Sequence, residues 1–196
     1  PEPGPMGVAG KEISGQVKMT VESKGIRYYP EHQLTAVNDS VLEFQNGKTV
    51  QFDLLAYTPK HQCPGVIKAT SLAGNSGWVE VNRNTMETAF PDVYAIGDIT
   101  SIPLEMKRPL PKAGVFAHYQ AEVVAHNILR TISGNKPDKT FDGYGQCFLE
   151  IGAGQAGYAG GNFYNSPLPD VKMKKPGMIW HWTKVWFEKY WFYKYF

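Results

Sequence analysis

The stretch TMETAFPDVYAIGD (Thr85–Asp98) decides the fold of this 196-residue chain. It ends in a short apolar run, VYAI (93–96), which favours a buried β-strand and is followed at once by Gly97 and Asp98. After a proline-rich loop, GVFAHYQAEVVAHNILRTIS (114–133) predicts a long helix. A strand, a loop and a long helix in this order indicate an α/β fold.

This strand–loop–helix unit suits a flavin site. Gly97 lets the backbone approach a cofactor closely, and Asp98 can accept a hydrogen bond from a ribityl hydroxyl. A helix that begins near Gly114 presents unpaired N–H groups and the positive end of its dipole. That end can stabilise negative charge on a reduced flavin ring. On these residues alone, the same unit without a ligand is an equally good interpretation.

A longer stretch carries a family resemblance. PLPKAGVFAHYQAEVVAHNI (109–128), together with the Gly97–Asp98 motif, resembles the pyridine nucleotide–disulfide oxidoreductase superfamily. Within it, the stretch is similar to the sulfide:quinone oxidoreductases and to the flavoprotein subunit of flavocytochrome c sulfide dehydrogenase. The resemblance implies FAD as cofactor. It also implies an α/β flavoprotein with two Rossmann-like dinucleotide-binding domains, of which this chain is a part that ends in a β/aromatic helical region.

The resemblance covers essentially the whole chain and divides it into three parts. Residues 1–62 are expected to be the C-terminal part of the second, NAD-type nucleotide-binding domain. Residues 63–140 then form the returning part of the FAD-binding domain, and residues 141–196 the region that faces quinone and membrane. The family's N-terminal G-x-G-x-x-G is missing and the chain begins with Pro1, so we expect a piece of a longer polypeptide that is inactive alone.

The resemblance assigns cofactor-binding roles to two segments. Gly97 and Asp98 correspond to the pair that holds the ribityl chain. The residues that correspond to the segment reaching the isoalloxazine ring are Lys112, Ala113, Gly114 and Val115.

Cys147, in GQCFLE (145–150), stands about where the family keeps a cysteine on the quinone side of the flavin. In that family it works with a second cysteine, here expected upstream, to accept sulfide sulfur and pass two electrons to the flavin. The thiolate is the nucleophile, and a nearby positive field would favour it. The alternative is a buried strand cysteine without chemistry. Cys63 matches no motif of the family.

The resemblance therefore implies a flavin-dependent enzyme that oxidises sulfide and reduces a membrane quinone. A type II NADH:quinone dehydrogenase is the second hypothesis; it would need no redox cysteine and would carry a second glycine motif upstream. A non-catalytic membrane-binding or assembly module is the third, because the chain holds only half of a flavin site. The sequence leaves open whether the protein is a homo-oligomer.

The C-terminal segment Met178–Phe196 contains four of the five tryptophans. Its lysines and its glutamate are too frequent for a comfortable membrane span. Trp and Tyr favour the headgroup level of a bilayer, and lysine can extend its charge to water. We therefore expect an interfacial helix, a membrane surface as partner and a peripheral, monotopic location. The alternative is an aromatic helix packed on the core or at a dimer interface.

Other kinds of site receive less support. IGAGQAG (151–157) fits G-x-G-x-x-G, with Asp170 about where a ribose-binding acid would fall. The glycines and prolines that follow argue against the helix that a phosphate needs, so a strand, a glycine turn and a strand are predicted instead. The net charge of +2 gives no support for nucleic-acid binding. His61 and Cys63 are too few ligands for a metal site.

Periodicity and turn residues predict the remaining elements. KEISGQVKMTVESKG (11–25) favours a helix with an apolar stripe, and Asn46-Gly47 favours a hairpin. Strands are predicted for IRYY (26–29), DLLAYTP (53–59) and WVEV (78–81). The residues expected on the inner face of the long helix are Val115, Tyr119, Val123 and Ile128.

Overall fold

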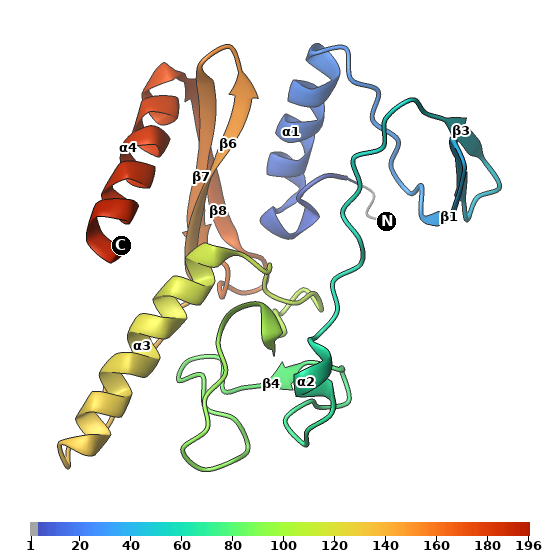
Figure 1. Ribbon diagram of the computed structural model, residues 1–196. Coiled ribbons are helices and arrows are strands. Elements are labelled where there is room, and N and C mark those ends of the chain that lie inside the picture. The colour runs from blue at the N-terminus through green and yellow to red at the C-terminus, as the bar shows by residue number, and fades with distance from the viewer. Residues whose placement is uncertain (1–3) are drawn as a thin grey trace. The chain divides into compact units, whose positions relative to one another are not determined.

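The computed structural model describes residues 4–196 (Figure 1). The chain divides into two compact units, Pro1–Gln62 and Cys63–Phe196. Both units combine helices with β-strands, in agreement with the expected α/β class.

The first unit begins with the 3-10 turn η1 (Gly7–Ala9) and helix α1 (Lys11–Ser23). Ile13 and Val17 are the buried residues of this helix, as its four-residue spacing predicts. Gly25 follows with a φ of 75°, a left-handed conformation that suits glycine just after a helix end.

A three-stranded antiparallel sheet follows, in the order β1 (Leu34–Asn38), β2 (Val41–Phe44), β3 (Thr49–Gln51). Gly47 lies in the β2–β3 turn with a φ of 77°, which confirms the Asn46-Gly47 hairpin. Strand β1 was not predicted from the sequence.

Two predicted strands of this unit, 26–29 and 53–59, are wrong, because neither segment is in a strand. Both are extended, but neither pairs with a neighbouring strand in the described chain, and their apolar residues remain exposed: Leu54 is 88% exposed. A β-rich composition reports how well side chains fit a half-buried sheet, and here no sheet receives them.

The second unit starts with short elements. Helix α2 (Gly65–Lys68) was not predicted. Strand β4 (Val79–Glu80) lies within the predicted 78–81 and pairs in parallel with β5 (Thr100–Ser101). The predicted strand 93–96 is wrong: only Tyr94 makes a single bridge there.

Helix α3 (Gly114–Ile132) is close to the predicted 114–133. Its buried residues are Phe116, Gln120, Val123 and Asn127, so the predicted inner face is right only at Val123. The buried amides explain the error. Gln120 and Asn127 satisfy backbone groups of neighbouring loops, and a search for apolar side chains passes over them.

A second antiparallel sheet, β6 (Tyr144–Gly152), β7 (Gln155–Asn162) and β8 (Asp170–Gly177), follows α3. Ala153 and Gly154, with φ values of 53° and 66°, form the turn between β6 and β7. The glycine motif 151–157 is therefore a hairpin, as predicted, and opens no helix.

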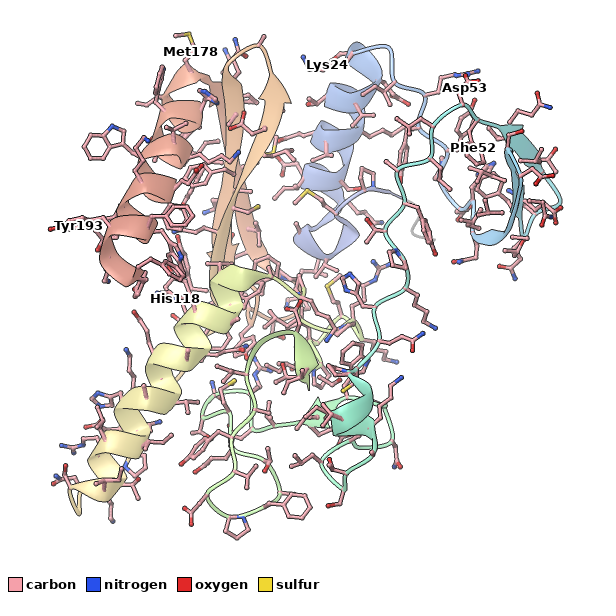
Figure 2. The ribbon with its side chains drawn as sticks, in the orientation of Figure 1. Lys24, Phe52, Asp53, His118, Met178 and Tyr193 are labelled. Atoms are coloured by element: carbon pink, nitrogen blue, oxygen red, sulfur yellow. The ribbon has the colours of Figure 1, made fainter. Side chains whose placement is uncertain are left out.

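Helix α4 (Met178–Tyr195) ends the chain, lies along the β6–β8 sheet in Figure 1 and confirms the predicted C-terminal helix. Trp180 stacks on Tyr158 of β7, with ring centroids 4.8 Å apart. Near the other end of α4, Trp191 contacts the His118 ring of α3 at 4.9 Å, where the two helices meet in Figure 2.

The aromatic core of this unit is centred on Phe116. Its ring packs edge-to-face on Phe141 and Phe163, at centroid distances of 6.3 and 5.1 Å. Its other neighbour is Gly145 of β6, where a Cβ atom would overlap the Phe116 ring. The absence of a side chain at this one position lets α3 pack against the sheet.

We expect Gly145→Ala to lower the free energy of unfolding by about 1–3 kcal/mol, because the added methyl forces the buried Phe116 ring from its place. Chemical denaturation of the purified chain measures this loss. Gly177→Ala is the matched control, since a Cβ there meets no atom within 4 Å. Equal stability of the two variants would contradict this packing.

Candidate cofactor site

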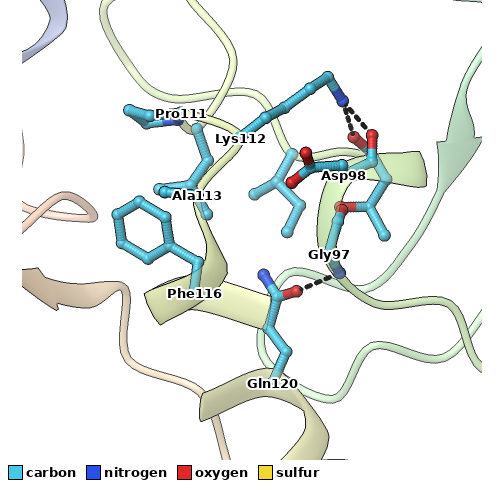
Figure 3. Close-up of a pocket in the computed structure, with 10 residues that line it drawn as sticks. Gly97, Asp98, Pro111, Lys112, Ala113, Phe116 and Gln120 are labelled. Atoms are coloured by element: carbon cyan, nitrogen blue, oxygen red, sulfur yellow. Dashed lines mark hydrogen bonds between the residues drawn. The ribbon is translucent and has the colours of Figure 1, made fainter. Parts of the chain in front are cut away.

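A pocket lies between the start of α3 and the 3-10 turn η2 (Gly97–Ile99) (Figure 3). The residues that line it are Gly97, Asp98, Thr100, Ile102, Leu110, Pro111, Lys112, Ala113, Phe116 and Gln120. Four of the six residues predicted to bind the cofactor are among them: Gly97, Asp98, Lys112 and Ala113. Gly114 and Val115 are not among the lining residues.

Glycine is required at position 97 by geometry. Its φ is 69°, and a Cβ atom would lie 3.1 Å from the Cβ of Ala117 on α3. The Gly97 N–H donates to Gln120 Oε1 at 2.7 Å (Figure 3), so the turn is fixed to the helix by a buried hydrogen bond. Glycine at this position therefore lets η2 pack closely against α3.

Lys112 closes one side of the pocket. Its ammonium donates to the carbonyl oxygens of Asp98 and Thr100, the latter at 3.0 Å, and lies 3.5 Å from the ring centroid of Trp78. Burial lowers the pKa of Lys112, while Asp98 and, more weakly, Cys63 act in the opposite direction. The Lys112 ammonium is thus held at a fixed position in the site, beside the ring of Trp78.

The start of α3 supplies further donors. Ala113, the residue before the helix, makes no side-chain cap. The N–H groups of Phe116 and Ala117 donate back to Ala113 O at 3.0 and 3.3 Å. This leaves the N–H groups of Gly114 and Val115 at the positive end of the helix dipole. These two residues can bind a ligand through their backbone N–H groups, although neither residue is part of the pocket lining.

Cys147 lies on the β6 strand next to this region. It is exposed, and it is two residues from Gly145, so both positions are on the same face of the sheet. Because Gly145 packs against Phe116, which lines the pocket, the face that carries Cys147 adjoins the pocket wall.

The surroundings of Cys147 favour the neutral thiol. Removal of water by neighbouring atoms raises the pKa of this thiol, and no cation of the described chain offsets the effect. Cys63, the other free cysteine, is 3% exposed.

Sequence reasoning missed Gln120, Phe116 and Trp78 as parts of the site. Gln120 and Phe116 are four residues apart on the buried face of α3, so the helical spacing from Phe116 could have revealed the glutamine. No signal in the sequence marks Trp78, because its contact with Lys112 joins positions far apart in the chain.

The arrangement matches a known family. The family model for pyridine nucleotide-disulphide oxidoreductases matches residues 2–121, which include η2 and the start of α3. The chain belongs to the pyridine nucleotide-disulphide oxidoreductase family. This family consists of FAD-binding flavoproteins, so the expected cofactor class and the expected α/β fold are confirmed.

The chain is similar in sequence to family members whose names refer to sulfide. It is 30% identical over 166 residues to the sulfide-quinone reductase of Aquifex aeolicus, a match that covers 79% of this chain and 37% of the relative. It is 27% identical over 120 residues to the mitochondrial sulfide:quinone oxidoreductase of Mus musculus, covering 61% of this chain and 25% of the relative.

The solved structure of the Aquifex aeolicus sulfide:quinone oxidoreductase superposes with a TM-score of 0.81 at 26% identity. The superposition covers 98% of this chain and 48% of that protein. The resemblance noted in the sequence is confirmed. The chain spans less than half the length of the relatives it matches.

The pocket suits FAD on the evidence of its own atoms. A close-approach glycine, an exposed carboxylate at Asp98, a fixed ammonium and free helix N–H groups surround it. Together they supply an acceptor for sugar-like hydroxyls and donors for an electron-rich ring edge.

We expect Gln120→Leu to destabilise the chain by about 1–3 kcal/mol, because the buried Gly97 N–H loses its acceptor while the side-chain volume is nearly kept. Thermal and denaturant unfolding measure the loss. Gln16→Leu is the control, since the amide of that helical glutamine contacts only the exposed Glu12. A Gln120→Leu chain as stable as the wild type would show that this bond does not hold the turn.

We expect alkylation of Cys147 by iodoacetamide to reach half its limiting rate at a higher pH in the folded chain than in the urea-unfolded chain. Burial raises the pKa of the thiol, so a higher pH is needed to form the reactive thiolate. The measurement uses a Cys63→Ser background. A folded midpoint at or below the unfolded one would contradict the assigned environment.

Proposed function

We propose that this chain is part of an FAD-dependent oxidoreductase that oxidises sulfide at Cys147 and passes the electrons through FAD to a membrane quinone. The observation that carries the proposal is the exposed Cys147 on the sheet face that adjoins the pocket wall through Gly145 and Phe116. Relatives named for sulfide oxidation and quinone reduction support it.

The chain's residues have separate roles in this proposal. Gly97 gives close backbone approach and Asp98 accepts hydrogen bonds from the ribityl chain. Lys112 and the start of α3 would stabilise negative charge on a bound flavin ring. FAD, when bound, would supply a two-electron acceptor.

Cys147 acts with a second cysteine from outside this sequence. In the proposed step, hydrosulfide attacks the disulfide that joins the two cysteines. The S–S bond breaks, a new S–S bond forms on one cysteine as a persulfide, and the other cysteine leaves as a thiolate. The sulfide sulfur is oxidised and the disulfide is reduced by two electrons, which the flavin then accepts.

Removal of water by neighbouring atoms raises the pKa of the Cys147 thiol, which makes Cys147 a poorer leaving group in disulfide exchange than a fully solvated cysteine.

Helix α4 is the proposed membrane contact. Two of its polar side chains face the sheet: His181 and Lys184 lie 3.1 and 3.3 Å from Glu150 of β6. Large aromatic side chains point outward: Trp186 is 75% exposed, and Tyr193, which points away from the sheet in Figure 2, is 90% exposed. This exposed aromatic face suits a helix lying in the interface of a bilayer, a peripheral location. Within residues 4–196, no helix is long and apolar enough to cross a membrane.

A type II NADH:quinone dehydrogenase is the rival proposal, since it shares the flavin pocket and needs no cysteine. The exposure of Cys147 beside the pocket favours sulfide. The third hypothesis, a non-catalytic module, makes no use of the pocket and is separated by whether the purified protein is yellow with flavin.

We expect sulfide, added anaerobically to the flavin-loaded full-length protein, to bleach the oxidised-flavin absorbance, which returns when quinone is added. Cys147→Ser removes the sulfur-accepting thiol, so we expect loss of at least about a hundredfold in the bleaching rate. Cys63→Ser is the control, because Cys63 is buried and outside the pocket lining. Bleaching by NADH alone, with no effect of Cys147→Ser, would favour the dehydrogenase instead.

A further inference from the structure

The basic residues of this chain are concentrated at its C-terminal end. Residues 170–196 contain six lysines and two acidic residues, whereas the whole chain has 20 basic and 18 acidic residues. The excess positive charge of the protein therefore lies in strand β8 and helix α4, the region that carries the exposed aromatic side chains.

The register of the sheet places one of these lysines beside α4. Lys174 of β8 pairs with Tyr158 of β7, so both side chains leave the same face of the sheet. Tyr158 stacks on Trp180 of α4, which identifies this face as the one that α4 covers. Lys174 thus projects alongside α4 and toward the same side of the molecule.

Some of the lysines have acidic partners. Lys184 lies 3.3 Å from Glu150, and Lys172 lies 3.9 Å from Asp170. Lys194 lies over the ring of Tyr195 at 5.0 Å. These contacts neutralise or occupy half of the six.

Lys174, Lys175 and Lys189 are exposed and make no ion pair within the described chain. Glu188 precedes Lys189, but neighbouring residues of a helix do not face each other. Lys174, on the sheet face that α4 covers, and Lys189, on α4 itself, therefore have no ion-pair partner among the described residues. Lys175 follows Lys174 in the strand and leaves the opposite face of the sheet.

We propose that this surface selects anionic phospholipid headgroups, with Lys174 and Lys189 as the contacting cations. The inference rests on the proposed attachment of α4 to a membrane and adds the lipid class that it prefers. A helix lying in the interface buries its apolar face roughly 5–10 Å into the headgroup and acyl boundary. Lysines on the flank of such a helix reach the phosphate level, where anionic lipids attract them.

The aromatic stripe decides between a bilayer and another polyanion. Trp182, Trp186 and Tyr190 are each more than half exposed. They lie on α4, the helix that also carries Lys189. A nucleic acid would gain from the cations but would leave this apolar area in water. A bilayer receives both, because Trp and Tyr favour the level of the headgroups.

Vesicle binding by the flavin-loaded full-length protein tests the proposal. Co-sedimentation is measured with phosphatidylcholine vesicles and with vesicles that also contain phosphatidylglycerol, at low and at high salt. We expect tighter binding to the anionic vesicles, a preference that salt reduces. The Lys174→Gln, Lys189→Gln variant should lose on the order of fivefold per lysine, or on the order of twentyfold in total, and only on anionic vesicles.

Two matched variants separate the alternatives. Lys24→Gln, Lys48→Gln removes the same charge from exposed positions of the first unit and should leave the lipid preference intact. Trp182→Ser, Trp186→Ser should weaken binding to both kinds of vesicle.

The outcomes distinguish this proposal from the attachment on which it rests. Equal binding of the wild type to both vesicles, sensitive to the tryptophan variant but not to the lysine variant, overturns the lipid preference and leaves attachment standing. Equal losses in the two lysine variants also overturn it, because net charge alone would then account for binding. Absence of binding to either vesicle overturns the attachment itself and the preference with it.

Discussion

The contact between the Phe116 ring and the bare backbone of Gly145 is the constraint on which the second unit depends. Phe116 lines the cofactor pocket and is buried against Phe141 and Phe163. It contacts β6 at Gly145, where a side chain would collide with the Phe116 ring. Through this contact the helix that begins the pocket and the sheet that carries Cys147 become one rigid arrangement. The distance between the pocket and Cys147 is thereby set by core packing, which tolerates little adjustment.

A second constraint operates inside the pocket. Gln120 and Lys112 direct their polar atoms at the backbone of η2 and of Thr100, so side chains of the α3 region hold a turn that contributes few contacts of its own. Preorganisation of this kind means that the groups facing a bound ring are in place before it arrives. The same logic explains why a polar glutamine occupies one of the most buried positions of the protein.

How much the sequence could predict depended on how local each signal was. The hairpin at Asn46-Gly47, α1, α3, α4 and the glycine turn of 151–157 follow from spacing within a few residues, and the structure has all of them. The strands expected at 26–29, 53–59 and 93–96 failed, because a strand also needs a partner that only the tertiary fold supplies. For the site, Gly97, Asp98, Lys112 and Ala113 came from a family resemblance and do line the pocket. Gln120 and Trp78 were missed, since their roles arise from contacts between distant parts of the chain.

The two halves of the second unit also differ in how far apart in the chain their contacts are. Strands β6, β7 and β8 follow one another in sequence and pair in that order, so their contacts close short loops. The pocket instead joins Trp78 to Lys112 and Gly97 to Gln120, and α4 joins Lys184 to Glu150, which requires longer loops to close first. Because local contacts form faster than distant ones, the hairpins would assemble ahead of the pocket and ahead of the packing of α4. The order of events during folding is then the β6–β8 sheet first and the flavin cradle second.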